Sequence, residues 1–158
     1  MKTEVDEYDD KYYHQILKLK LKEEDKLEVQ ASSGMPARRV LQRIANQYSK
    51  SMFVILYDGK VSGIFGVVPS GQPGIGIGYL LTNDEIKNYR FAMAKYTVPV
   101  FIRLLQQFPV ITNYVSSEHK TSIKWLKRFG AHFDGKAYIL HDPKVPFYKF
   151  ELRISDYV

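Results

Sequence analysis

The chain contains no cysteine, so neither a disulfide bond nor a thiolate metal site is available to it. Its histidines are few and show none of the short spacings of a zinc site: His14, His119, His132 and His141. No apolar run approaches the roughly 18 residues that a membrane-spanning helix requires. The start MKTEVDEYDD is too acidic for a signal peptide. These absences predict a soluble protein of the cytosol.

Charge is distributed unevenly along the 158 residues. Residues 1–10 hold five acidic residues and one lysine, a net charge of −4, and the total is +6, so residues 11–158 carry +10. A basic body favours an anionic partner, such as a nucleic acid, a phosphorylated cofactor or an acidic protein face. Solvated lysines on helix surfaces explain the same balance, and no nucleic-acid-binding signature accompanies it. Non-specific nucleic acid therefore remains one candidate partner.

The length predicts a single domain over residues 1–158, large enough to bury about two-thirds of its unfolded surface. Apolar residues at helical spacing predict helices over residues 9–21 and 36–48. The acidic run at residues 23–25 interrupts the first of them. No repeat, linker or low-complexity stretch divides the chain.

A two-residue period marks three strands. Residues 52–57 and 60–68 alternate around Asp58 and Gly59, a pair that supplies the positive backbone angles of a tight hairpin turn. Residues 74–81 (GIGIGYLL) alternate glycine with isoleucine, which predicts a strand that something approaches closely across one face. These glycines do not resemble a phosphate-binding loop, because no strand leads directly into them and no helix opens from them.

The rest of the chain alternates helices and strands. A long helix is predicted over residues 84–107, kinked or divided near Thr97 because Pro99 lies inside it. The remaining elements are a strand at 110–115, a helix at 122–129 that ends at Gly130, and strands at 131–141 and 147–154. This order predicts an α/β fold with a mixed, mostly antiparallel sheet and helices on both faces.

Two segments, FVILYDGKVSGIFGV and SIKWLKRFGAHF, resemble the GNAT family of N-acetyltransferases, which use acetyl-coenzyme A. The first resembles that family's second and third strands, and the second resembles its fourth helix entering the sixth strand. The resemblance implies a GNAT-like sheet in which two central parallel strands, ending near Thr82 and Val115, splay apart. The gap between them would expose backbone groups to the pantetheine arm of the cofactor.

A narrower resemblance is to an acetyltransferase-like family of tailed bacteriophages, some of whose members are internal virion proteins. The positions that carry it are Tyr79, Leu81, Thr82, Asn113, Val115, Trp125, Leu126, Gly130 and Phe147. This resemblance implies a phage-encoded protein located in the host cytoplasm or in the virion.

The GNAT resemblance also implies a cofactor site along the gap. Its candidate residues are Leu81, Thr82, Asn83, Lys87, Arg90, Asn113 and Trp125. Trp125 would stand in a wall beside the gap, together with the lysines of its helix. A tryptophan that only packs in the core fits the sequence equally well.

Two departures from the family pattern weaken this site. Active members have a loop of the type Gln/Arg-x-x-Gly-x-Gly/Ala that binds the pyrophosphate, whereas this chain has TNDEIKNYR. Asp84 and Glu85 place negative charge there, and Lys87 and Arg90 compensate in part. The proton-donating tyrosine of the family is replaced by Leu126. We therefore expect weak or absent binding of acetyl-coenzyme A.

The remaining candidates for acid–base chemistry are His119, Glu118 and Tyr79. His119 and Glu118 follow the strand at 110–115, at the mouth of the expected gap, and an imidazole titrates near neutral pH. An ordinary histidine at a helix start and a tyrosine that packs in a strand are the simpler interpretations.

Two functional hypotheses follow. The first is a phage-encoded N-acetyltransferase that transfers acetyl from acetyl-coenzyme A to an amine of a host or phage protein, or to a small amine. The second is a catalytically silent acetyltransferase-like fold that serves as an internal virion or host-interaction protein. The acidic loop and the missing tyrosine favour the second, the strand gap and its basic flank favour the first, and a fold alone does not decide activity.

Overall fold

The computed structural model describes residues 2–157, so both ends of the expected domain, residues 1 and 158, lie outside the described residues. The strands are β1 (Thr3–Glu7), β2 (Met52–Tyr57), β3 (Lys60–Pro69), β4 (Ile75–Thr82), β5 (Val110–Ser116), β6 (His132–Tyr138) and β7 (Phe147–Arg153). The helices are α1 (Tyr13–Leu17), α2 (Glu23–Ser33), α3 (Ala37–Gln47), α4 (Arg90–Gln107) and α5 (Lys120–Phe129). Short 3-10 turns are η1 (Asp10–Tyr12), η2 (Ser49–Ser51), η3 (Asp84–Asn88) and η4 (Ile154–Asp156).

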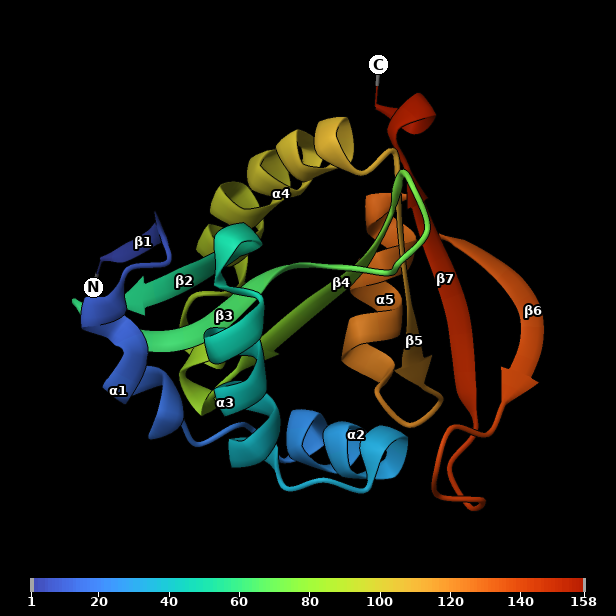
Figure 1. Ribbon diagram of the computed structural model, residues 1–158, viewed down its shortest axis with the longest axis horizontal. Coiled ribbons are helices and arrows are strands. Elements are labelled where there is room, and N and C mark those ends of the chain that lie inside the picture. Colours follow the sequence, from blue (N-terminus) through green and yellow to red (C-terminus); the bar gives the residue numbers. More distant parts are fainter. Residues whose placement is uncertain (1, 158) are drawn as a thin grey trace.

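The strands form one sheet in the order β1-β2-β3-β4-β5-β7-β6, with helices on both faces (Figure 1). The side chains of α1 and α3 pack against one face of the central strands, and those of α4 pack against the other with the aromatic residues of α5. Only the pairing of β4 with β5 is parallel within the described residues. The expected α/β architecture is confirmed. Of the helices between residues 2 and 157, none combines the length and the apolar character needed to cross a membrane.

The N-terminal segment contains two elements that its periodicity does not reveal. The acidic start forms β1, which pairs antiparallel with β2 and exposes most of its side chains, so its charge does not oppose pairing. The predicted helix over residues 9–21 is shorter, because η1 and α1 end at Leu17. The acidic run at residues 23–25 opens α2 rather than interrupting a helix, since negative side chains stabilise a first turn through the helix dipole.

The hairpin of β2 and β3 is confirmed. Asp58 and Gly59 have positive φ angles of 53° and 81°, as the two-residue turn requires. The predicted helix at 36–48 is also present as α3, which Pro36 precedes.

The long helix divides at Tyr89 and not near Thr97. The first part is η3, and α4 then continues without interruption through Pro99. Tyr89 turns into the core, where its hydroxyl lies 2.6 Å from Ser62 Oγ and its ring stacks on Tyr57 at a centroid distance of 4.9 Å. This tertiary contact explains why the chain breaks at Tyr89.

The glycines of β4 permit close packing, as their alternation predicts. A Cβ atom on Gly76 would lie 2.2 Å from Val67 Cγ1, and one on Gly78 would lie 2.6 Å from Ile111 Cγ2. Side chains from the two neighbouring strands therefore occupy the space over these glycines.

Replacing Gly76 by alanine is expected to lower the free energy of unfolding by about 1–3 kcal/mol, because Val67 and the ring of Phe108 would have to move. Urea unfolding measures the change. Gln72→Ala, in the exposed loop before β4, is the matched control and should stay within about 0.5 kcal/mol. Equal midpoints for the two variants would show that β4 does not depend on this close approach.

Candidate functional site

β4 and β5 lie side by side at their starts and diverge toward their ends (Figure 1). Among the described residues their parallel pairing runs from Ile75 and Val110 to Ile77 and Thr112, and it stops there. A cavity of about 320 Å³ lies between the diverging segments. We call this space, between residues 78–81 of β4 and 113–115 of β5, the strand gap.

Trp125 and Leu126 of α5 form part of the wall of the strand gap. The Trp125 ring stacks on Phe129 at a centroid distance of 5.3 Å and meets the edge of Phe101 at 6.3 Å. Trp125 is half-buried, so it both packs on the core and lines the gap. Leu126 is buried, and its aliphatic side chain has no proton to donate.

Asn113 joins the two strands where their ladder ends. Its Nδ2 donates to the carbonyl of Gly78 at 2.7 Å, and its Oδ1 accepts from the amide of Tyr114 at 2.7 Å. A side chain therefore replaces the next main-chain hydrogen bond at the narrow end of the strand gap.

The N-terminal half of α2 closes the open end of the strand gap through a buried charged network. Asp25 Oδ2 accepts from the amide of Thr82 at 2.9 Å and from Lys22 Nζ at 2.6 Å. Lys22 Nζ also donates to Thr82 Oγ1 at 3.0 Å, and its amide donates to the Thr82 carbonyl at 2.9 Å. Burial alone would raise the pKa of Asp25, but the hydrogen bond from His119 and the charge of Lys22 outweigh it and lower that pKa.

His119 lies inside this network, at the start of α5. Its Nδ1 accepts from the amide of Ser122 at 3.4 Å, and its Nε2 faces Asp25 Oδ1 at 2.8 Å. The residue is 3% exposed. Both ring nitrogens therefore have partners within the protein.

Glu28 stands one turn after Asp25 on α2 and was not among the residues that the sequence suggested. Its Oε2 accepts from the amide of Ser116, the last residue of β5, at 2.9 Å. Burial raises the pKa of Glu28, although the Ser116 amide opposes the shift. Glu28 is the only acidic residue among the described residues that line the strand gap. The sequence gives no signal for Glu28, because the acidic run at residues 23–25 indicates an interruption and no helix is predicted over the residues that follow it.

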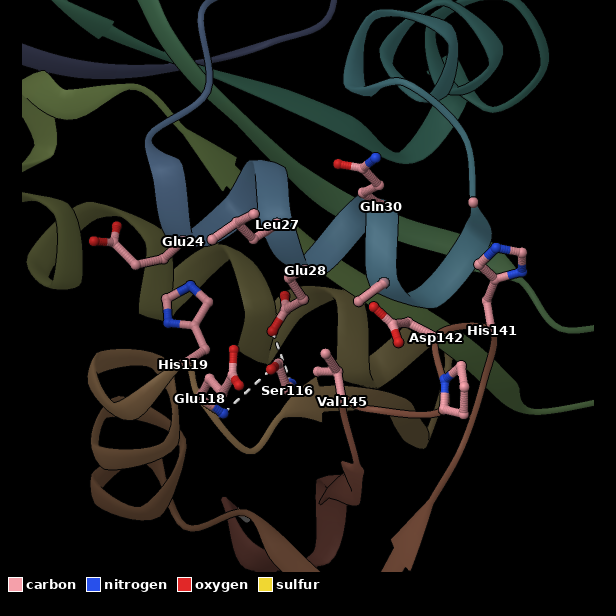
Figure 2. A pocket seen from close by; sticks show the side chains of 13 residues that line it. Glu24, Leu27, Glu28, Gln30, Ser116, Glu118, His119, His141, Asp142 and Val145 are labelled. Carbon is pink, nitrogen blue, oxygen red and sulfur yellow. Dashed lines mark hydrogen bonds between the residues drawn. The ribbon is translucent and has the colours of Figure 1, made fainter.

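A second cavity, of about 540 Å³, lies on the other side of α2. Figure 2 shows Glu28 between α2 and Ser116, with Glu118 and His119 on one side and Asp142 on the other. The acidic residues that line this second cavity are Glu24, Glu28, Glu118 and Asp142. Glu28 lines both cavities, so it forms part of the wall between them.

Of the predicted acid–base residues, Glu118 is exposed and lines the second cavity. Tyr79 lines the strand gap, but its hydroxyl lies close to Gly66 of β3 and has no hydrogen-bond partner among the described residues. Burial raises the pKa of this hydroxyl well above its usual range. The structure therefore does not bring His119, Glu118 and Tyr79 together around one point.

The predicted cofactor residues also fall into separate groups. Those that line the strand gap are Leu81, Asn113 and Trp125. Thr82 is buried at the end of β4 in the network with Lys22. Asn83 caps η3 by accepting from the amide of Glu85 at 3.0 Å.

The segment between β4 and α4 is acidic and has the form of a 3-10 turn. Asp84 is largely exposed and lies 3.8 Å from Lys87, which is exposed as well. Arg90 is exposed at the start of α4. Both cations are therefore exposed and outside the lining of the strand gap, and Lys87 lies beside an acidic side chain.

No family model and no curated protein matches this sequence. Several solved structures share its fold. Ard1 from Thermoplasma volcanium is 11% identical, with a TM-score of 0.70 over 98% of this chain and 99% of that one. Ribosomal-protein-alanine N-acetyltransferase from Brucella melitensis is 9% identical, with a TM-score of 0.68 over 95% and 99%. An N-acetyltransferase from Staphylococcus aureus Mu50 is 13% identical, with a TM-score of 0.68 over 98% and 99%. This likeness shows the GNAT acetyltransferase fold.

Proposed function

We propose that this protein transfers an acetyl group from acetyl-coenzyme A to an amine. The observation that carries the proposal is the separation of β4 and β5 after Ile77 and Thr112, beside a largely apolar cavity. Where the ladder stops, the facing main-chain groups that neither Asn113 nor α2 already binds are available to hydrogen-bond the amide links of a pantetheine arm. The apolar walls would keep water from the reacting carbonyl.

The residues present fit the arm of this cofactor better than its phosphates. Leu81, Asn113 and Trp125 would hold the arm, because all three line the strand gap. Lys87 and Arg90 would meet the phosphates, beside an acidic turn that contains no glycine. When bound, acetyl-coenzyme A supplies an activated thioester carbonyl. The chain then has to orient an amine beside it and take up the proton of that amine.

We assign the proton-accepting role to Glu28. A general base works best when its pKa lies near the working pH, and burial shifts the pKa of this carboxyl in that direction. The Ser116 amide holds Oε2 and thereby orients the carboxylate. His119 uses both ring nitrogens within the protein, so in this proposal it positions α5 and is not the base.

The acceptor amine would enter through the second cavity. Glu24, Glu118 and Asp142 place negative charge around that cavity, which attracts a protonated amine of a protein or of a small molecule. Tyr79 remains a candidate proton donor, although this role requires its hydroxyl to turn away from Gly66.

Replacing Asp84 by asparagine and Glu85 by glutamine is expected to tighten acetyl-coenzyme A binding by about fivefold at low salt, because two charges that repel the phosphates are removed. Quenching of the single tryptophan, Trp125, or calorimetry measures the affinity. The gain should shrink at high salt. Glu7→Gln on the distant edge strand β1 is the control and should bind as the unmodified protein does.

Two outcomes of this titration separate the possibilities. A tight affinity that neither the double variant nor salt alters would contradict the position assigned to the phosphates. Absence of any binding would remove the enzymatic proposal.

A second candidate function is a catalytically silent fold, with the protein acting as an internal virion or host-interaction protein of a phage. The observations that favour it are the buried Leu126, where the family's tyrosine is expected, and the acidic η3 turn. Its partner would be an acidic protein face or non-specific nucleic acid, in keeping with the basic body of the chain. Acetyl-coenzyme A neither bound nor consumed would favour this candidate.

A further inference from the structure

The strand gap raises the question of what fixes its width. At the narrow end, Asn113 bridges β5 to the Gly78 carbonyl. Toward the open end the described residues show no ladder between β4 and β5. Something other than sheet hydrogen bonding must therefore hold the two walls at a constant distance.

The Asp25 carboxylate connects both walls at the open end. Its Oδ2 accepts from the amide of Thr82, the last residue of β4, and its Oδ1 faces Nε2 of His119, which caps the start of α5. Asp25 is 2% exposed, so water does not compete for these bonds. One short side chain thus spans the separation between the end of β4 and the helix that follows β5.

Two further contacts attach α2 to the same points. Lys22 bonds Thr82 through its side chain and through its main chain, with its amide donating to the Thr82 carbonyl. Glu28, three residues after Asp25 and therefore on the same face of α2, accepts from the amide of Ser116 at the end of β5. The last residue of each diverging strand therefore donates its amide to a carboxylate of α2.

We infer that Asp25 is a positioning residue that sets the width of the strand gap, in place of the hydrogen-bond ladder that β4 and β5 lack there. The carboxylate holds Thr82 and His119 at the separation that its own two oxygens allow. This inference concerns the cavity itself and does not require the cavity to accept acetyl-coenzyme A. Its failure is therefore distinguishable from failure of the proposed function.

Asp25→Asn tests this inference, because asparagine keeps the size of the side chain but has one acceptor oxygen instead of two. We expect the Thr82 and Ser122 amides to exchange with deuterium at least about tenfold faster, while amides in the β2–β3 hairpin keep their rates. Acrylamide should also quench Trp125 more strongly, since Trp125 lines the gap. Glu24→Gln, exposed on the same helix, is the control and should change neither measurement.

A folded Asp25→Asn variant with unchanged Thr82 exchange and unchanged Trp125 quenching would overturn the inference. If this variant does not fold, the unmodified protein gives the answer through exchange at low denaturant. The Thr82 and Ser122 amides should then open in one step with a shared dependence on denaturant. Independent opening of these two amides would equally overturn the inference.

Discussion

Replacing Asp25 by alanine is expected to lower the free energy of unfolding by about 3–5 kcal/mol, the range for removing one partner of a buried ion pair. The Lys22 side chain is 11% exposed, so its ammonium group would stay buried without a counter-charge. The Thr82 amide would lose its acceptor as well. Urea unfolding monitored by circular dichroism measures this decrease in the free energy of unfolding.

A double variant distinguishes the effect of an unpaired buried charge from a general disruption of the fold. Removing both charges with Lys22→Met and Asp25→Leu should recover much of the loss, because no unpaired charge is then left in the core. Glu24→Ala, exposed in the same turn of α2, should cost no more than about 0.5 kcal/mol. If Asp25→Ala costs no more than Glu24→Ala, the buried network does not stabilise the protein.

The same network predicts how stability depends on acid. The folded-state pKa of Asp25 lies below its ordinary value of 3.8, because the stabilisation by His119 and Lys22 exceeds the effect of burial. A carboxyl with a lowered pKa contributes stability above its unfolded pKa and loses it as the pH falls through the folded pKa. Asp25→Ala should therefore flatten the loss of stability below about pH 4.

Replacing Glu28 by glutamine is expected to lower the rate of acetyl transfer by at least about a hundredfold, the low end for the loss of a general base. Glutamine keeps an oxygen that can accept from the Ser116 amide, so the local structure should persist. Consumption of acetyl-coenzyme A with a protonated amine as acceptor measures the rate. An unchanged rate would mean that water or another residue takes the proton.

The substitution Glu28→Gln should not lower stability at neutral pH, in contrast to the loss expected for Asp25→Ala. The folded-state pKa of Glu28 is raised, so its ionised form is disfavoured in the folded protein and stability falls as the pH rises through that pKa. Removing the charge should leave thermal stability at neutral pH unchanged or higher. By contrast, His119→Gln should weaken the Asp25 network and lower stability. The rate of acetyl transfer by the molecules that remain folded should change little.

Part of this structure could be predicted from the sequence, because a few residues have strong local backbone preferences. Asp58 and Gly59 specify a hairpin because their backbone angles suit one turn type, and Gly130, with a φ of 95°, ends α5 because a left-handed residue stops a helix. The alternating glycines of β4 indicated close approach, since the absence of Cβ atoms has the same meaning in any sheet. Such features depend on a few neighbouring residues, so the strands and helices that they mark could be predicted from the sequence, whereas β1 and α2 could not.

The site was decided by contacts between residues far apart in the chain. Asp25 accepts from an amide 57 residues away and pairs with a histidine 94 residues away, and the bond of Glu28 to Ser116 spans 88 residues. In the sequence Asp25 belongs to an acidic run that looks like the interruption of a helix, and nothing marks Glu28, because periodicity reports which face is apolar and not what lies opposite. Tertiary structure placed α2 across the diverging ends of β4 and β5 and gave its carboxylates their partners. Burial raises the pKa of Glu28, whereas the pKa of Asp25 is lowered because His119 and Lys22 outweigh the effect of burial.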